Sequence, residues 1–193
     1  FARGQALGFR YPRVDLLRWP VFRVLAQPTV RSIIRLAGVI GLSVAVGAGF
    51  WGSSDPFQNV TPVLVWVIWW VGVVYVCALI GDLWVLINPF RTLFAWAEAI
   101  VARVTGHRLS LEYPYPKALG MWPAVFGLMG FLWAELIWWG GSVPWNLAVT
   151  ITVYGVFTWI GMYIYGREVW LQNGDTFSVA FGIFSRFAPL ELR

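Results

Sequence analysis

Charged residues are scarce in this sequence. Asp, Glu, Lys and Arg make up 12% of the 193 residues, whereas 59% are apolar. An ordinary soluble domain is roughly a quarter charged and less than half apolar. The composition therefore excludes a typical soluble domain and indicates a chain that lies mostly in a membrane. The fourteen Trp residues agree, because Trp is favoured where hydrocarbon meets the wet boundary.

Cysteine and histidine are each present once. Cys77 lies in an apolar stretch and cannot form an internal disulfide, and His107 stands alone in a polar linker. Metal sites normally need three or four ligands, so we predict no metal site and recognise no cofactor beyond bound lipid. Phosphate-binding loops, nucleophile elbows and zinc-helix motifs are also missing from the sequence, and no serine has a histidine base nearby. Catalytic residues therefore stay unassigned.

The positive residues that are present have an uneven distribution. All fourteen Lys and Arg residues fall within Arg3–Arg35, Arg91–Lys117 and Arg167–Arg193, whereas Gly52–Val60 and Gly140–Asn146 carry none. Cytoplasmic loops of membrane proteins collect Lys and Arg, and short external loops lack them. The pattern predicts four crossings, with both ends of the chain and the central loop in the cytoplasm.

Four apolar stretches could form these crossings, and they predict an all-α integral membrane fold. A span needs ~20 apolar residues to cross the ~30 Å hydrocarbon layer. The expected spans are Ile33–Trp51, Thr61–Gly81, Leu119–Trp139 and Leu147–Tyr165. In the first, Gly41, Ala45 and Gly49 recur at every fourth residue, which predicts a face that packs closely against another helix.

The remaining segments suit the membrane surface. Residues 1–32 are rich in Arg and are expected to form a basic cytoplasmic arm, and 33–193 to form a single transmembrane domain. Phe90–Val104 and Thr176–Phe187 have apolar residues at helical spacing and are too short or too charged to span. We interpret both as amphipathic surface helices.

A faint internal repeat relates the two halves, 33–104 and 119–187. Gly81–Asn88 resembles Gly166–Asn173, with the glycines 85, the tryptophans 86 and the asparagines 85 positions apart. Each copy would hold two spans and one surface helix, so the copies would share one orientation in the membrane. The alternative is that Gly, Trp and Asn mark any inner membrane boundary.

Glu135 is the candidate functional residue within a span. It interrupts an apolar stretch about one turn from the external end. A charge at a helix centre costs ~2.5–3.5 kcal/mol, and less near the boundary. It could serve as a proton relay, ligand anchor or catalytic base. The alternative is a structural carboxyl that is hydrogen-bonded to Trp, Thr or Asn of a neighbouring span, with Asn146, Thr150 and Thr152 as candidates. Either interpretation places Glu135 inside the bundle or at a partner interface.

A second group of polar residues is expected at the inner boundary. This inner-boundary cluster consists of Asp82, Asn88, Arg91, Arg167, Asn173 and Asp175. We expect Asp82 to pair with Arg35 or Arg91, and Arg167 to cluster with Glu168 and Asp175. The two asparagines are expected to cap or turn the backbone.

Three passages resemble a known family. Asp82–Leu93, Phe131–Leu136 and Trp170–Pro189 are similar to segments of bacterial polytopic membrane proteins known as fenitrothion hydrolases, and the resemblance covers most of 33–189. It implies a bacterial membrane protein that hydrolyses an organophosphate ester. It carries no assignment of catalytic residues.

The leading hypothesis is an integral subunit or scaffold of a larger membrane assembly in the bacterial inner membrane. The alternatives are a membrane-bound hydrolase of organophosphate-like esters and a small proton-coupled transporter that uses Glu135. The expected partners are membrane lipids and other membrane subunits, or a second copy of the chain. Nucleic acid is not expected, because the positive charge lies on one side and suits anionic lipid headgroups.

Overall fold

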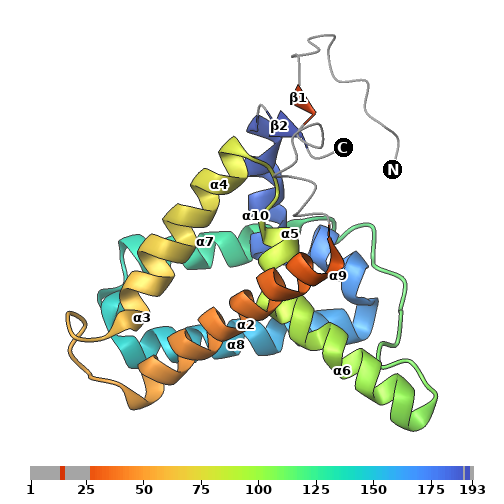
Figure 1. Cartoon of the computed structure of the whole chain (residues 1–193), viewed down its shortest axis with the longest axis horizontal. Coiled ribbons are helices and arrows are strands. Elements are labelled where there is room, and N and C mark those ends of the chain that lie inside the picture. The colour runs from red at the N-terminus through yellow and green to blue at the C-terminus, as the bar shows by residue number, and fades with distance from the viewer. Residues whose placement is uncertain (1–13, 16–26, 189, 192–193) are drawn as a thin grey trace.

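The computed structural model describes residues 14–15, 27–188 and 190–191. Their fold is helical, as predicted, apart from a short parallel pair in which β1 (Val14–Asp15) lies beside β2 (Leu190–Glu191) (Figure 1). Most of the expected basic arm lies outside the described residues, and the first long helix already begins at Pro28.

Among the residues that the structure describes, three helices are long and apolar enough to cross a membrane. The first is α2 (Pro28–Trp51), with 24 residues, and another is α8 (Pro144–Tyr165), with 22. The third is a 20-residue run of α3 (Val60–Pro62), η2 (Val63–Gly72, with wider π-helical turns) and α4 (Val73–Leu79). The other helices are α5 (Trp84–Ile87), α6 (Pro89–Thr105), α7 (Trp122–Leu136), η3 (Trp139–Ser142), α9 (Arg167–Asn173), α10 (Thr176–Phe184) and η4 (Ser185–Phe187).

The fourth expected span is shorter than the sequence predicted. Helix α7 has 15 residues, which is about 22 Å at 1.5 Å per residue and less than the ~30 Å hydrocarbon layer. Gly120, with φ at 47°, belongs to the turn before α7, and the chain leaves the helix at Ile137 to enter η3. The fourth crossing therefore stays a prediction.

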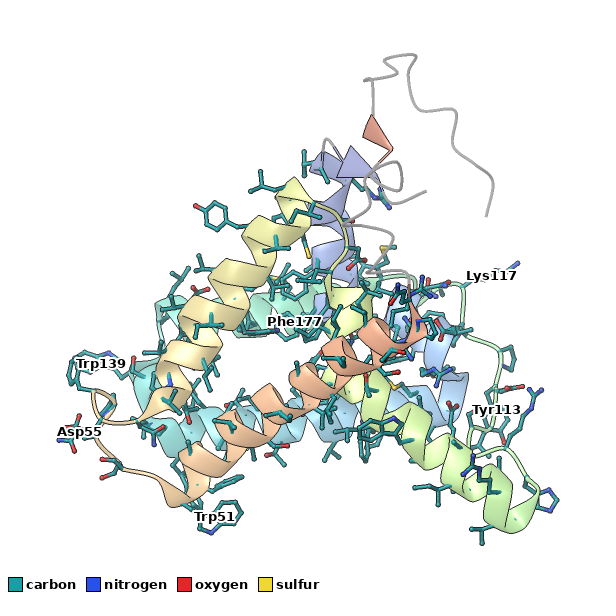
Figure 2. The ribbon with its side chains drawn as sticks, viewed as in Figure 1. Trp51, Asp55, Tyr113, Lys117, Trp139 and Phe177 are labelled. Carbon is teal, nitrogen blue, oxygen red and sulfur yellow. The ribbon has the colours of Figure 1, made fainter. Side chains whose placement is uncertain are left out.

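The two loops without Lys or Arg lie at the same end of the bundle. Figure 2 shows Trp51, Asp55 and Trp139 on one side of the molecule and Tyr113 and Lys117 on the opposite side. The loops without Lys or Arg and the central loop that contains Lys117 therefore lie on opposite sides of the described helices.

The close contact of α2 is made by part of the predicted small-residue face. Ala45 and Gly49 are buried, and a Cβ on Gly49 would lie 2.6 Å from the Cβ of Ala148 on α8. Backbones can approach this closely only where side chains are small. Gly41 was expected in the same contact, but a Cβ there would meet nothing within 4 Å. Its face borders a cavity, described below.

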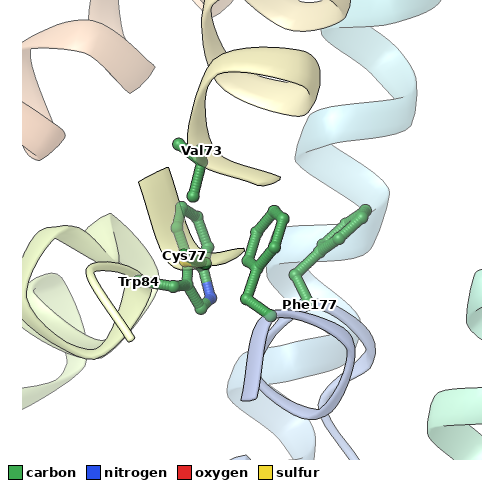
Figure 3. Packing of buried hydrophobic residues seen from close by; sticks show 5 residues of the cluster. Val73, Cys77, Trp84 and Phe177 are labelled. Carbon is green, nitrogen blue, oxygen red and sulfur yellow. The ribbon is translucent and has the colours of Figure 1, made fainter. Parts of the chain in front are cut away.

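Helix α10 belongs to the core and is not a surface helix as expected. Phe177 and Phe181 are 6% and 0% exposed and pack with Val73, Cys77 and Trp84 in one cluster (Figure 3). The sequence correctly predicts a helix here. Its phenylalanines face α4, α5 and α7 of the same chain, because aromatic rings bury more area against other side chains than along a boundary.

Helix α6 fits the expected amphipathic surface helix more closely. Its first turns are anchored by the buried rings of Phe90 and Phe94. Beyond them, Trp96, Ile100 and Val104 recur at every fourth residue and are exposed. They form an apolar stripe of the kind that lies along headgroups.

The two segments of the expected repeat share local features. Gly81 and Gly166 both have positive φ, at 128° and 86°. Trp84 and Trp170 are both buried, and neither indole N–H has a hydrogen-bond acceptor in the described part of the chain. These likenesses agree with duplication, which stays a prediction.

Candidate functional site

A polar cavity of about 420 Å³ lies between α5, α9, α10 and the start of α6. Its charged lining consists of Asp82, Arg91, Glu168 and Arg186. Two guanidinium groups can bind an anion and two carboxylates a cation, so the cavity suits a ligand that carries both charges. This cavity is the candidate site.

Three residues of the predicted inner-boundary cluster line the cavity, namely Asp82, Asn88 and Arg91. Asn88 is buried, and its side-chain oxygen accepts a hydrogen bond from the backbone N–H of Arg91, 3.0 Å away, so it caps α6 as expected. Its amide nitrogen donates to the hydroxyl of Ser178 at 3.4 Å and links α6 to α10. Asn173 does not act as a cap and donates to the carbonyl of Val169 within α9.

Ion pairs join α6 to α9 along one side of the cavity. Arg91 Nη2 lies 2.7 Å from Glu168 Oε1, and Arg167 lies 2.6 Å from Glu98 Oε2 and 3.2 Å from Glu168 Oε1. Arg167 thus pairs with Glu168 as expected, but not with Asp175. All four side chains are partly exposed, so the pairs fix geometry more than they stabilise the fold.

Asp82 makes no ion pair with any described residue. The expected partners were Arg35 and Arg91, but Arg91 pairs with Glu168. One carboxylate oxygen of Asp82 accepts from the N–H of Val85 at the start of α5. Burial raises the pKa of this carboxyl above its ordinary value, and the neighbouring N–H groups and the charge of Arg91 lower it by less.

Asp175 is the most deeply buried carboxyl group among the described residues, at 1% exposure. Its oxygens accept hydrogen bonds from the hydroxyls of Tyr154 and Thr158 and from the N–H of Ser178. Burial raises its pKa, and the hydrogen bonds partly offset that effect. Asp175 therefore holds α8 to α10 and does not line the cavity.

Glu135 lies apart from both of these groups. Its side chain is half-buried, and it takes part in none of the hydrogen bonds or ion pairs of the described residues. The three residues proposed as its partners donate their side-chain hydrogen bonds to backbone carbonyls instead. Thr150 donates to Asn146 O, Thr152 to Ala148 O, and Asn146 to Gly140 O. In the described part of the chain, none of these three residues donates a hydrogen bond to the carboxyl of Glu135.

A second, larger cavity is almost entirely apolar. It measures about 720 Å³ and lies between α2, η2, α7 and α8. Small residues line two of its walls, Gly41 and Ala45 on α2 and Gly130 and Ala134 on α7. A Cβ on Gly41 or Gly130 would meet nothing within 4 Å. The small-residue spacing of Gly41, Ala45 and Gly49 was interpreted as a face that packs closely against another helix, and Gly41 and Ala45 of that face line this cavity.

His107 is exposed on the linker. Within residues 14–15, 27–188 and 190–191, no three His, Cys, Asp or Glu side chains lie close enough together to hold a metal ion. Comparison with known proteins finds no match to a family model, a curated protein or a solved structure.

Proposed function

We propose that the protein is an integral subunit or scaffold of a larger assembly in the bacterial inner membrane. The observation that carries this proposal is the apolar cavity between α2, η2, α7 and α8. This cavity of about 720 Å³ is open to the outside of the bundle, so its apolar walls are not covered by the described part of the chain. A stable membrane protein would fill it with lipid or with another chain.

The proposed occupant is a transmembrane helix of a partner subunit. Lipid tails are flexible and can fill a space beside any apolar wall. A rigid helix instead needs small residues opposite it, so that the two backbones can approach. Gly41 and Ala45 on α2, together with Gly130 and Ala134 on α7, meet that need from two sides.

Substitution of a cavity glycine tests the proposal. Gly41→Leu would place a side chain in the proposed partner's space without a clash inside the chain, because a Cβ there meets nothing within 4 Å. Gly47→Leu is the matched control, since Gly47 lies on the same helix, is equally open and does not line the cavity. The protein would be purified in mild detergent and its co-purifying chains quantified.

We expect a specific partner, or a second copy of the chain, to be lost with Gly41→Leu and retained with Gly47→Leu. The proposal fails if both variants recover the same chains in the same amounts. Recovery of phospholipid alone, displaced by Gly41→Leu, would assign the cavity to lipid instead.

In the proposed orientation, four crossings place residues 1–32, 88–118 and 166–193 in the cytoplasm. The support is the segregation of Lys and Arg. In a Cys77→Ser background, an impermeant thiol reagent applied to intact cells should label Asp55→Cys and leave His107→Cys unlabelled. Labelling of position 107 would overturn this orientation.

A further inference from the structure

The polar cavity offers hydrogen-bond donors of a kind that bind phosphate. Both hydrogen bonds of Arg91 to Glu168 use the same nitrogen, Nη2. Its Nη1 and Nε take part in no hydrogen bond with the described residues, and neither does the guanidinium of Arg186. A guanidinium presents paired N–H groups that match phosphate oxygens.

The same cavity offers an acceptor for a cation. Asp82 lines it without an ion-pair partner in the described ranges, and one of its oxygens remains after the bond to the N–H of Val85. Gly182 faces this carboxylate, and a Cβ there would lie only 3.8 Å from Asp82 Oδ2. The absence of a side chain at Gly182 therefore leaves room next to the carboxylate.

We propose that this cavity binds a phosphoethanolamine group, with the phosphate held by Arg91 and Arg186 and the ammonium held by Asp82. The charges of the cavity lining balance, with two guanidiniums and two carboxylates, so a ligand with both charges leaves neither sign in excess. A volume of about 420 Å³ admits a group of this size, since one water takes about 30 Å³.

The position of the cavity favours a lipid as the source of this group. Asp82 follows the end of α4, and Glu168 follows the end of α8, so the cavity adjoins the ends of two helices that are long enough to span. In a membrane, lipid headgroups lie level with the ends of spanning helices. Its wall also includes the apolar side chains of Met121, Val179 and Ile183, which suit the glycerol and upper acyl part of a phospholipid.

Short-chain lipids titrated against the intact protein in detergent, with native mass spectrometry as the readout, test the assignment. Dihexanoyl phosphatidylethanolamine should bind about tenfold more tightly than the phosphatidylcholine and phosphatidylglycerol equivalents. Choline has no N–H to donate, and the glycerol headgroup has no positive charge. Equal affinity for all three lipids would overturn the proposal.

Two substitutions separate the two halves of the headgroup. Asp82→Asn keeps a side-chain oxygen that can accept from the N–H of Val85 and should remove the preference for phosphatidylethanolamine. It should not weaken phosphatidylglycerol binding, because loss of a carboxylate does not disfavour an anionic lipid. Arg186→Gln, at an exposed position, should weaken both lipids about tenfold. Arg108→Gln is the control, because Arg108 pairs with Glu112 on the surface and does not line the cavity. No effect of Arg186→Gln would refute the phosphate assignment.

Soluble phosphoethanolamine distinguishes the two sources of the ligand. Binding of the lipid with little binding of the soluble group supports a membrane lipid. If the soluble group binds as tightly as the lipid and shows the same dependence on Asp82, the site stands and its ligand is a soluble phosphoester.

Discussion

The hydroxyl of Tyr154 on α8 donates a hydrogen bond to the carboxylate of Asp175, which caps α10. The ring of Tyr154 also packs edge-on against Phe90 of α6 and Phe177 of α10, with centroids 5.3 and 5.1 Å away. One side chain therefore fixes three helices relative to one another. The polar cavity depends on this arrangement, because its walls come from α6 and α10.

Loss of this hydroxyl should destabilise the protein. Tyr154→Phe keeps both ring contacts but leaves Asp175 with one donor fewer, and we expect the free energy of unfolding to fall by about 1–3 kcal/mol. Thermal or denaturant unfolding in detergent, followed by tryptophan fluorescence, would measure it. Tyr163→Phe is the control on the same helix, because Tyr163 is exposed. Equal stability of the two variants would show that the hydrogen bond contributes nothing.

Asp175 should also make stability depend on pH. Burial raises the pKa of this carboxyl above the ordinary value of 3.8, so the folded protein holds its proton more strongly than the unfolded chain. Its contribution to stability should be complete below pH 3.8 and should decline as pH rises through the higher folded pKa. Asp175→Asn, which can still accept and cap, should remove this dependence. A curve of unchanged shape in that variant would contradict the assignment.

The sequence predicted where the helices lie better than it predicted which parts of the chain each helix contacts. Long apolar stretches are a strong local signal, and α2 and α8 lie close to their expected positions. Local pattern could not reveal that Phe177 faces the core, because the same spacing serves a helix lying on a surface. The length of α7 was overestimated for a related reason: Trp138 and Trp139 are apolar, but the backbone has already left the helix there.

The candidate site was predicted in part. Asp82, Asn88 and Arg91 stand close in sequence, and all three line the cavity. Glu168 and Arg186 come from the other half of the chain, and only the tertiary fold brings them to the same place. Tyr154 carries no sequence signal as a polar residue of interest, because one tyrosine in an apolar span is ordinary.

The contact between α2 and α8 gives a prediction about packing. Gly49→Ala would place a Cβ 2.6 Å from that of Ala148 and 2.7 Å from the carbonyl oxygen of Pro144. The helices would have to separate, at a cost of about 1–3 kcal/mol in unfolding free energy. Gly47→Ala, with nothing within 4 Å of its Cβ, should leave stability unchanged or slightly raised. Unfolding of both variants in one detergent checks this, and equal stability of the two would mean that α2 and α8 do not touch at Gly49.

Glu135 gives the prediction that bears most directly on function. The fold supplies it with no partner among the described residues, so Glu135→Gln and Glu135→Leu should each change the unfolding free energy of the isolated protein by less than about 0.5 kcal/mol. A larger loss with Leu would reveal an intramolecular partner. Stability alone, however, does not test the roles proposed for this carboxyl.

Assays of subunit recovery and of proton-coupled uptake distinguish the same two variants. If a partner subunit holds Glu135, Glu135→Leu should release that subunit during purification and Glu135→Gln should retain it, because an amide keeps most of the hydrogen bonds of the carboxyl. If Glu135 carries protons, Glu135→Gln should abolish proton-coupled uptake into vesicles while assembly survives, because an amide cannot exchange the proton. Retention of both assembly and uptake in both variants would remove Glu135 from every functional role considered for it. That outcome would leave the cavity residues Asp82, Arg91 and Arg186 as the groups to test next.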